Sequence, residues 1–127
     1  MISEAIRKEA IRLGFSACGF SKATKLPEDA KRLNKWLNKD LHGRMGYMAN
    51  HFEKRTDPGL LVEGAQSVIS LLYNYYTPEK QADPSAPVLS KYAFGKDYHF
   101  VLKDRMNQLF DFIKSLDPEA EGRVFVD

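Results

Sequence analysis

The stretch Ser67-Val-Ile-Ser-Leu-Leu-Tyr73 gives the clearest fold signal in this chain. Its β-branched and apolar residues predict a strand, and so continuous an apolar run is typical of a strand that is covered on both faces. The strand leads into Tyr73-Asn-Tyr-Tyr76, which places aromatic side chains at its end. These aromatics either wall a planar cofactor or cover the end of the sheet, and the sequence supports both interpretations equally.

Helical periodicity and turn residues surround this strand. Apolar residues at spacings of three and four predict amphipathic helices, and glycine or Asp-Pro pairs mark where the helices end. The helices are expected at 2–13, from Pro27 onwards and at 97–116, and further short strands at 16–20 and 123–127. Residues 42–66 are expected to be irregular, and the proline-rich residues 77–90 to form a flexible loop or lid. The fold class is therefore α/β or α+β, with a small mixed sheet flanked by helices.

Length and composition favour one soluble globular domain over residues 1–127, with 43% hydrophobic and 28% charged residues. The net charge of +2 comes from 19 basic and 17 acidic residues, which is too even to argue for nucleic-acid binding by itself. No signal peptide or stretch long enough to span a bilayer is evident, so we expect a cytoplasmic protein with no membrane partner.

Metal-ligating residues are sparse and scattered. Cys18 is the single cysteine, which excludes an internal disulfide and any cysteine-rich metal or iron–sulfur site. It lies in a short apolar stretch and is expected to be a buried small hydrophobe. The three histidines, His42, His51 and His99, match no zinc-binding spacing. We therefore expect no metal ligands among these side chains.

The densest group of chemically active residues is Lys91-Tyr-Ala-Phe-Gly-Lys-Asp-Tyr-His99. These nine residues contain three aromatics, a histidine, an aspartate, two lysines and a glycine, and they lead into the predicted helix at 97–116. A loop that only joins two elements needs a cap and a turn residue, whereas an anionic or planar ligand needs this density of polar and stacking groups. Asp97 is at the same time the expected helix N-cap.

Two further clusters have a functional and a structural interpretation. His42-Gly-Arg-Met-Gly-Tyr-Met48 is either a loop that approaches a ligand or, more simply, a helix C-cap at Gly43 followed by a packed turn. Lys54-Arg-Thr-Asp-Pro-Gly59 is either an anion site or a solvated turn in which Asp57 caps a short helix.

Five motifs in order resemble the N-terminal domain of epoxyqueuosine reductase. They are His42-Gly-Arg-Met-Gly-Tyr-Met48, Arg55-Thr-Asp-Pro58, Glu63-Gly-Ala-Gln-Ser-Val-Ile69, Tyr92-Ala-Phe-Gly-Lys-Asp-Tyr-His99 and Arg123-Val-Phe-Val-Asp127. The resemblance covers the whole chain but only the first third to half of a full-length member. That family reduces epoxyqueuosine to queuosine at the wobble position of tRNA, and its N-terminal domain is a nitroreductase-like, cobalamin-binding domain.

The resemblance implies an enzyme, an oxidoreductase, for the longer protein. It implies cobalamin in this domain and two 4Fe-4S clusters in a ferredoxin-like module that is absent here. It also implies that Asp127 donates a proton near the cobalt, and that the remaining site residues contact the corrin ring or the substrate nucleoside. Those residues are Arg55, Tyr92, Lys96, Asp97, Tyr98 and His99.

The abrupt end at Asp127, directly after a predicted strand, favours a truncated chain that is inactive by itself. A sheet cut at its last strand also favours a dimer through its exposed edge. The sequence does not identify the electron donor.

Two alternatives remain open from the sequence. The aromatics and the basic loop suit FMN in a nitroreductase-like domain as well as they suit cobalamin. A non-catalytic tRNA-contact module is the second alternative, because the second predicted helix and its flanks are rich in cations. Those cations are Lys22, Lys25, Lys31, Arg32, Lys35 and Lys39. The simpler interpretation of this helix is a solvated face.

Overall fold

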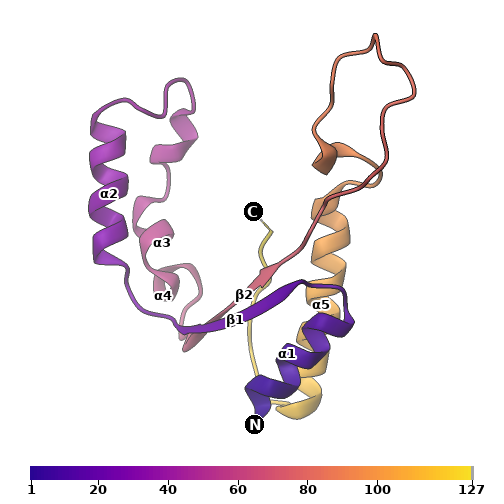
Figure 1. Cartoon of the computed structure of the whole chain (residues 1–127). Helices are drawn as coiled ribbons and strands as arrows, with labels where there is room; N and C mark the ends of the chain where they lie inside the picture. Colours follow the sequence, from indigo (N-terminus) through magenta and orange to yellow (C-terminus); the bar gives the residue numbers. More distant parts are fainter. Residues whose placement is uncertain (127) are drawn as a thin grey trace. The chain divides into compact units, whose positions relative to one another are not determined.

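The structure, a computed structural model, describes residues 1–126 (Figure 1). The chain divides into two compact units. Unit 1 comprises Met1–Gly19 and Ser70–Asp127, and unit 2 comprises Phe20–Ile69. The division falls within both strands, so each unit contains one end of the strand pair. The prediction that residues 1–127 form one domain stays a prediction.

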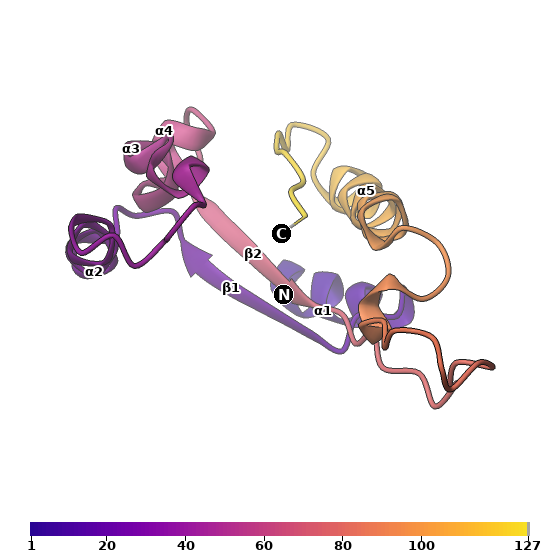
Figure 2. The same ribbon diagram turned by 90° about the horizontal axis from the view of Figure 1, so that it is seen from above.

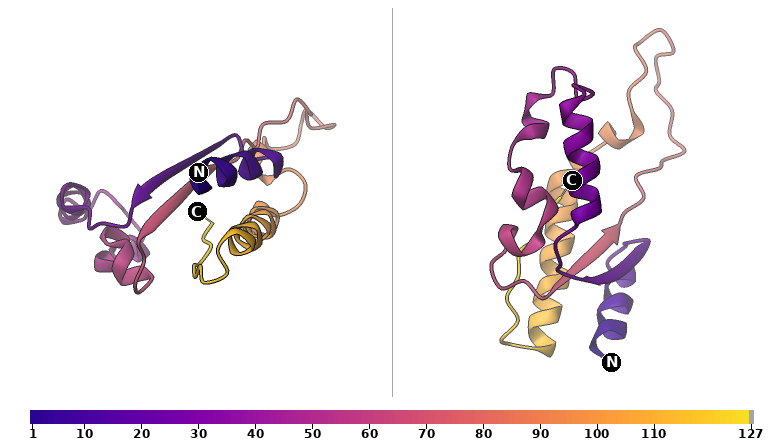
Figure 3. Two further views of the ribbon diagram at one scale, coloured as in Figure 1. Left: turned by 90° about the horizontal axis from the view of Figure 1, so that it is seen from below. Right: turned by 90° about the vertical axis from the view of Figure 1, so that its left-hand side faces the viewer.

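Unit 1 is built on two helices that lie side by side. Helix α1 (Ile2–Arg12) packs against α5 (Tyr98–Leu116), as Figure 1 and both views of Figure 3 show. The packed faces bury apolar residues from both helices and from the chain that follows α1, because the helical period brings these side chains to one side. The buried apolar residues are Ile6, Ala10, Phe15, Cys18 and Leu109. Burial of Cys18 confirms the expectation from its apolar neighbours.

The ends of these helices follow the sequence signals. Gly14 comes directly after the C-cap of α1 and has a φ of +98°, a conformation that favours glycine. Asp97 is the N-cap of α5, and its carboxylate accepts a hydrogen bond from the backbone N–H of His99. Both predicted boundaries are confirmed to within a residue.

The sheet contains two paired strands, β1 (Ala17–Lys22) and β2 (Ser67–Leu72). Hydrogen bonds join Ser16 N–H to Leu72 O at one end of the pair and Ala23 N–H to Gln66 O at the other. The start of β1 therefore lies beside the end of β2, so the strands are antiparallel. Figure 2 shows the two strands lying along each other. The mixed α/β class is confirmed, and the predicted dimer through a sheet edge stays a prediction.

Two expectations about strands are wrong. The apolar run of β2 is not covered on both faces: its side chains are half-buried or exposed, and Leu72 is 64% exposed. Residues 123–126 form no strand, because a strand requires a ladder of hydrogen bonds to a neighbour and these residues have none in the described part of the chain. Asp127 lies outside the described residues.

Unit 2 consists of short helices. Helix α2 (Pro27–Asn38) starts with proline in its first turn, as predicted, and packs against α3 (Phe52–Thr56), as Figure 2 shows. A 3-10 helix η1 (Gly46–Ala49) precedes α3, and α4 (Pro58–Leu61) follows it. Residues 42–66 were expected to be irregular, and these one-turn helices are a correction.

The caps of unit 2 separate the alternatives that the sequence left open. Asp57 caps α4 by accepting a hydrogen bond from the N–H of Gly59 at 2.9 Å, which confirms the structural interpretation of that turn. Gly43 is not a helix C-cap, because α2 ends at Asn38 with Lys39 as its C-cap. Gly43 instead takes a positive φ of +56° within the following turn.

The packing of α1 on α5 predicts a large effect for one core residue. Leu109 is 3% exposed, so Leu109→Ala leaves a cavity and should lower the free energy of unfolding by about 2–5 kcal/mol. Leu72→Ala is the matched control, because Leu72 is 64% exposed and should lose no more than about 0.5 kcal/mol. Urea denaturation measures both, and equal losses would contradict this description of the core.

Candidate functional site

Unit 1 contains a cleft lined largely by aromatic and apolar side chains. Its volume is about 390 Å³. The lining side chains come from the residues after α1, from β2 and the loop beyond it, from α5 and from the last described residues. They are Phe15, Leu71, Tyr73, Tyr75, Tyr92, Tyr98, Leu102, Met106, Phe125 and Val126. Tyrosines combine a flat apolar ring with a polar hydroxyl, so this lining suits a planar ligand with polar substituents.

Three tyrosines form a continuous edge-to-face row in this lining. The ring centroid of Tyr92 lies 6.3 Å from that of Tyr75 and 6.0 Å from that of Tyr98, at interplanar angles of 82° and 89°. Tyr75 and Tyr92 keep 62% and 51% of their surface exposed. Because these rings are exposed, their faces are available for stacking.

Tyr92 and Tyr98 are two of the six cofactor-binding residues predicted from the sequence. The two interpretations of Tyr73-Asn-Tyr-Tyr76 stay predictions, although two of its tyrosines lie in the cleft lining. Tyr73 and Tyr75 line the cleft, whereas Tyr76 lies outside that lining, with the Lys91 ammonium 4.6 Å from its ring centroid.

His99 and Asp97 form a polar pair at the N-terminus of α5. The Asp97 carboxylate accepts from the His99 backbone N–H at 2.9 Å and lies 2.8 Å from His99 Nδ1. An ionised carboxylate only accepts hydrogen bonds, so Nδ1 carries the hydrogen in this pair. The imidazole also stacks on Tyr98, with ring centroids 4.1 Å apart. His99 is thus oriented by two contacts, with Nε2 as its remaining polar atom.

Asp97 is a poor proton donor in this position. The hydrogen bond from the backbone N–H of His99, followed by the contact with its side chain, lowers the pKa of Asp97. The carboxylate is therefore ionised at neutral pH and serves as a cap and an orienting acceptor. A proton donor at this site is therefore a residue other than Asp97.

The remaining predicted site residues lie apart from this lining. Lys96 is exposed and is not among the residues that line the cleft. Arg55 belongs to unit 2, where its guanidinium donates to the backbone oxygens of Asn50 at 2.8 Å and Tyr47 at 3.3 Å. Asp127 lies outside the described residues. The structure thus brings Tyr92, Tyr98, Asp97 and His99 together, and it gives Arg55 an evident role in holding its own loop.

The cleft also contains residues that the sequence analysis did not single out. Phe15, Leu102 and Met106 belong to the apolar faces of unit 1, and their periodicity marks a core as readily as a site. Phe125 and Val126 reach the cleft because the segment after α5 runs back along that helix, as Figure 1 shows. A Cβ at Gly122 would lie 3.0 Å from the ring of Phe110, so this segment packs closely on α5.

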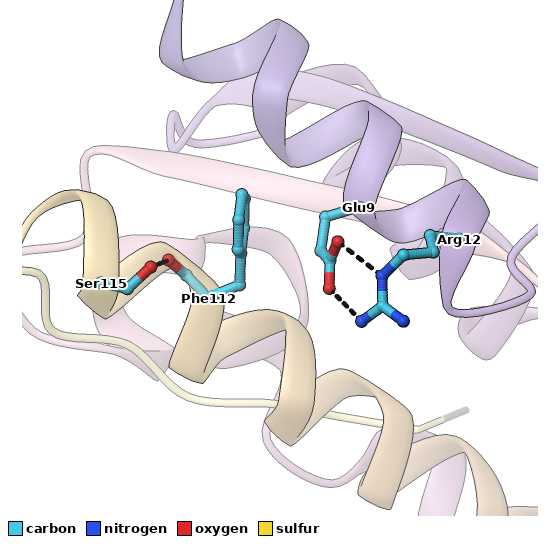
Figure 4. Close-up of polar contacts among 4 residues, drawn as sticks. All are labelled: Glu9, Arg12, Phe112 and Ser115. Carbon is cyan, nitrogen blue, oxygen red and sulfur yellow. Dashed lines mark hydrogen bonds and ion pairs between the residues drawn. The ribbon is translucent and has the colours of Figure 1, made fainter.

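Polar contacts stabilise the two helices that carry the cleft. Glu9 and Arg12 of α1 form a two-bonded ion pair with N–O distances of 2.8 and 2.5 Å, and the Ser115 hydroxyl donates to the Phe112 carbonyl near the end of α5 (Figure 4). The hydrogen bond from Arg12 lowers the pKa of Glu9. Both contacts are local to one helix, so they support the scaffold and take no part in the lining.

Gln81 makes two hydrogen bonds within the loop between β2 and η2 (Lys91–Ala93). The Gln81 amide donates to Pro87 O at 3.0 Å, and its oxygen accepts from the Leu89 N–H at 2.7 Å. These bonds tie together two parts of the loop. The interpretation of residues 77–90 as a lid stays a prediction.

Within residues 1–126, no group of three or more histidine, cysteine or acidic side chains could hold a metal ion, and no helix could span a membrane.

The fold and the cleft define a mixed α/β protein with an aromatic-lined cleft. The sequence model of the family described as "Epoxyqueuosine reductase QueG, DUF1730" matches residues 55–127, which is more than half of the chain. The chain therefore belongs to the epoxyqueuosine reductase family.

Individual relatives agree with this assignment. An epoxyqueuosine reductase of Leadbetterella byssophila is 54% identical over 125 residues, which cover 98% of this chain and 41% of that protein. A structure of epoxyqueuosine reductase from Bacillus subtilis, with its catalytic aspartate loop swung out of the active site, has a TM-score of 0.78 at 29% identity. It is matched over 91% of this chain and 32% of that chain.

A further solved structure contains RNA. It is an epoxyqueuosine reductase with an epoxyqueuosine-modified tRNA-Tyr stem loop, with a TM-score of 0.76 at 30% identity over 88% of this chain and 31% of that chain. The chain spans about two fifths, 40–41%, of the length of three curated epoxyqueuosine reductases that it matches.

The contact between Asp97 and His99 predicts a pH-dependent start of α5. Because the folded state lowers the pKa of Asp97, its contribution to stability is complete above the ordinary value of about 3.9 and is lost as the pH falls through the lower folded value. An NMR titration of the His99 amide should therefore show a midpoint below that ordinary value. Asp97→Asn keeps a capping acceptor and should abolish this titration, and an unchanged titration in that variant would contradict the assignment.

Proposed function

We propose that residues 1–127 are the N-terminal, cobalamin-binding part of a longer, cytoplasmic epoxyqueuosine reductase, which reduces epoxyqueuosine to queuosine in tRNA. Membership of the family and the aromatic cleft of unit 1 support this proposal. The single observation that carries it is the row of Tyr75, Tyr92 and Tyr98, which presents partly exposed rings beside the oriented imidazole of His99.

In the proposal, the cleft holds part of a corrin ring. Ligand pockets commonly enclose about 300–1,000 Å³, and a volume of about 390 Å³ takes one edge or face of a macrocycle rather than all of it. In the proposal the tyrosine rings pack against the apolar corrin, and His99 and Lys96 contact its amide side chains or the substrate nucleoside. When bound, cobalamin supplies the low-potential electrons that opening an epoxide requires.

The proton for the departing epoxide oxygen is assigned to Asp127. Phe125 and Val126, the two residues before it, line the cleft. An aspartate near an apolar ring keeps its proton more readily than one in water, because desolvation disfavours the charged form. The Bacillus subtilis relative is described with a catalytic aspartate loop, which supports an aspartate in this role. The lowered pKa of Asp97 makes that residue the weaker candidate.

The electrons must come from outside residues 1–127. A 4Fe-4S cluster needs four cysteine ligands, and this chain has one cysteine. We assign the two clusters to the ferredoxin-like module of the longer protein, so residues 1–127 alone should be inactive. The physiological donor to those clusters is unassigned.

The RNA-contact alternative loses part of its support in unit 2. Lys31 pairs with Glu28 at 2.8 Å and Arg32 with Asp29 at 2.9 Å along the exposed face of α2. Two of the six cations that motivated this alternative are thus partly neutralised by their own helix. The tRNA stem loop in a related structure supports tRNA as the substrate of the whole enzyme in the proposal.

Cofactor binding tests the proposal directly. The purified protein is titrated with reduced cobalamin, and visible and EPR spectra are recorded, with a saturable spectral shift as the expected result. Tyr98→Ala removes a ring from the row and should weaken binding by about tenfold, since a stacked aromatic contributes roughly 1 kcal/mol or more. Tyr47→Ala is the matched control, because Tyr47 is 59% exposed in unit 2 and should bind as the parent does.

A different cofactor would overturn the proposal. Saturable binding of FMN by a well-folded sample that ignores cobalamin would identify a flavin-binding, nitroreductase-like domain instead.

Catalysis tests the role of Asp127 separately. In the full-length protein, Asp127→Asn should lower the turnover of epoxyqueuosine-modified tRNA by about 10²–10⁴-fold, the range expected when a general acid is removed. Cobalamin affinity should stay unchanged, because the substitution preserves the size of the side chain. Normal turnover in this variant would remove Asp127 from the mechanism.

A further inference from the structure

Arg105 makes two unlike contacts on the inner side of α5. Its Nη1 donates a hydrogen bond to the backbone oxygen of Leu13, at the C-terminus of α1, at 2.9 Å. Its guanidinium carbon lies 5.0 Å from the ring centroid of Tyr73, just beyond the end of β2. One side chain thus connects the end of α1, the residue after β2 and the middle of α5.

The guanidinium is suited to both contacts at once. The last carbonyls of a helix lack partners within the helix, so a cation that donates there is stabilising. The planar guanidinium donates in its plane while its face stacks on an aromatic ring. A lysine ammonium is a compact point charge and does not combine the two contacts in this way.

Tyr73 is the contact through which Arg105 reaches the cleft. The Tyr73 ring lines the cleft and also meets the buried ring of Phe15 edge-on, at 6.0 Å and 77°. Leu102 and Met106, which flank Arg105 on α5, line the same cleft. Tyr73 is therefore held between Phe15 and Arg105, and removal of the cation frees one side of the ring.

Gly14 provides the space that this arrangement needs. A Cβ at Gly14 would lie 2.3 Å from Arg105 Nη1 and 3.9 Å from Tyr73 Cε2. Any side chain at this position therefore displaces the guanidinium, in addition to the strain of a φ of +98°. Gly95, with a φ of +79°, has no such neighbour within 4 Å, so it isolates the backbone effect.

We propose that Arg105 is a positioning residue of the cleft, which fixes the ring of Tyr73 for the planar ligand by anchoring it to the C-terminus of α1. The ligand identity rests on the proposed function. Arg105 acts through Tyr73 and does not itself line the cleft. The positioning role itself stands on the contacts within unit 1.

The test combines a ligand-free and a ligand-binding measurement on the full-length protein. In the ligand-free protein with 13C-labelled tyrosine, Arg105→Lys and Gly14→Ala should both shift the ring signals of Tyr73, and Gly95→Ala should not. Cobalamin affinity should fall by about tenfold in Arg105→Lys, which corresponds to the loss of one well-formed stacking contact. Arg32→Lys, the same exchange on the exposed face of α2, is the matched control and should bind as the parent does.

A double-mutant cycle separates positioning from general stability. If Arg105 acts through Tyr73, Arg105→Lys should have no further effect on cobalamin affinity in a Tyr73→Ala background. Additive losses of affinity, or unshifted Tyr73 signals in Arg105→Lys, would overturn the inference. Failure of every sample to bind cobalamin, with Tyr73 signals that shift as expected, would refute the proposed ligand and leave the positioning role established.

Discussion

The packing of α1 against α5 is the constraint on which the rest of unit 1 depends. Ile6 and Ala10 of α1 and Leu109 of α5 exclude water from this contact, and Phe15 extends it past the end of α1. Apolar burial of this kind is the main favourable term in folding, so it fixes the relative position of the two helices. The cleft is a consequence, because Phe15, Leu102 and Met106 belong to the same faces and continue them to the surface.

One side of the cleft is formed by buried side chains that continue the core, and the other side is formed by exposed side chains. Phe15 is 3% exposed, and its edge-on contact holds Tyr73 in place. Tyr75 and Tyr92 come from the connection between β2 and α5 and are more than half exposed. Such exposed loop residues adjust to a ligand at little cost, whereas buried helix residues do not. This combination suits a large ligand of which unit 1 contacts one part.

Polar groups around the cleft are fixed by local geometry at the start of α5. The N-terminus of a helix has unpaired N–H groups, and Asp97 satisfies one of them while it orients His99. The same hydrogen bonds that make Asp97 a good cap keep it ionised. Asp97 is therefore ill suited to donate a proton, and the proposal assigns that role to Asp127.

Local features were readable from the sequence. The periodicity of 2–13 and 97–116, the proline at Pro27 and the capping residues Asp57 and Asp97 predicted the helices, because these signals act between residues a few positions apart. Cys18 was correctly expected to be buried. The motif at 91–99 predicted Tyr92 and Tyr98 as cofactor-binding residues; both line the cleft, and their role in binding stays a prediction.

Only the tertiary structure decided which distant residues meet. Phe15, Tyr73, Tyr98 and Phe125 are far apart in the sequence, and apolar patterning cannot tell a cleft wall from a core. The exposure of β2 was likewise not predicted. A continuous apolar run indicates that burial would be favourable, but it does not show whether a neighbouring element is present to cover the strand. The sequence by itself therefore determined the three longer helices and the capping residues Asp57 and Asp97, because these signals are local. The packing of α1 on α5 decided which distant side chains meet in the cleft.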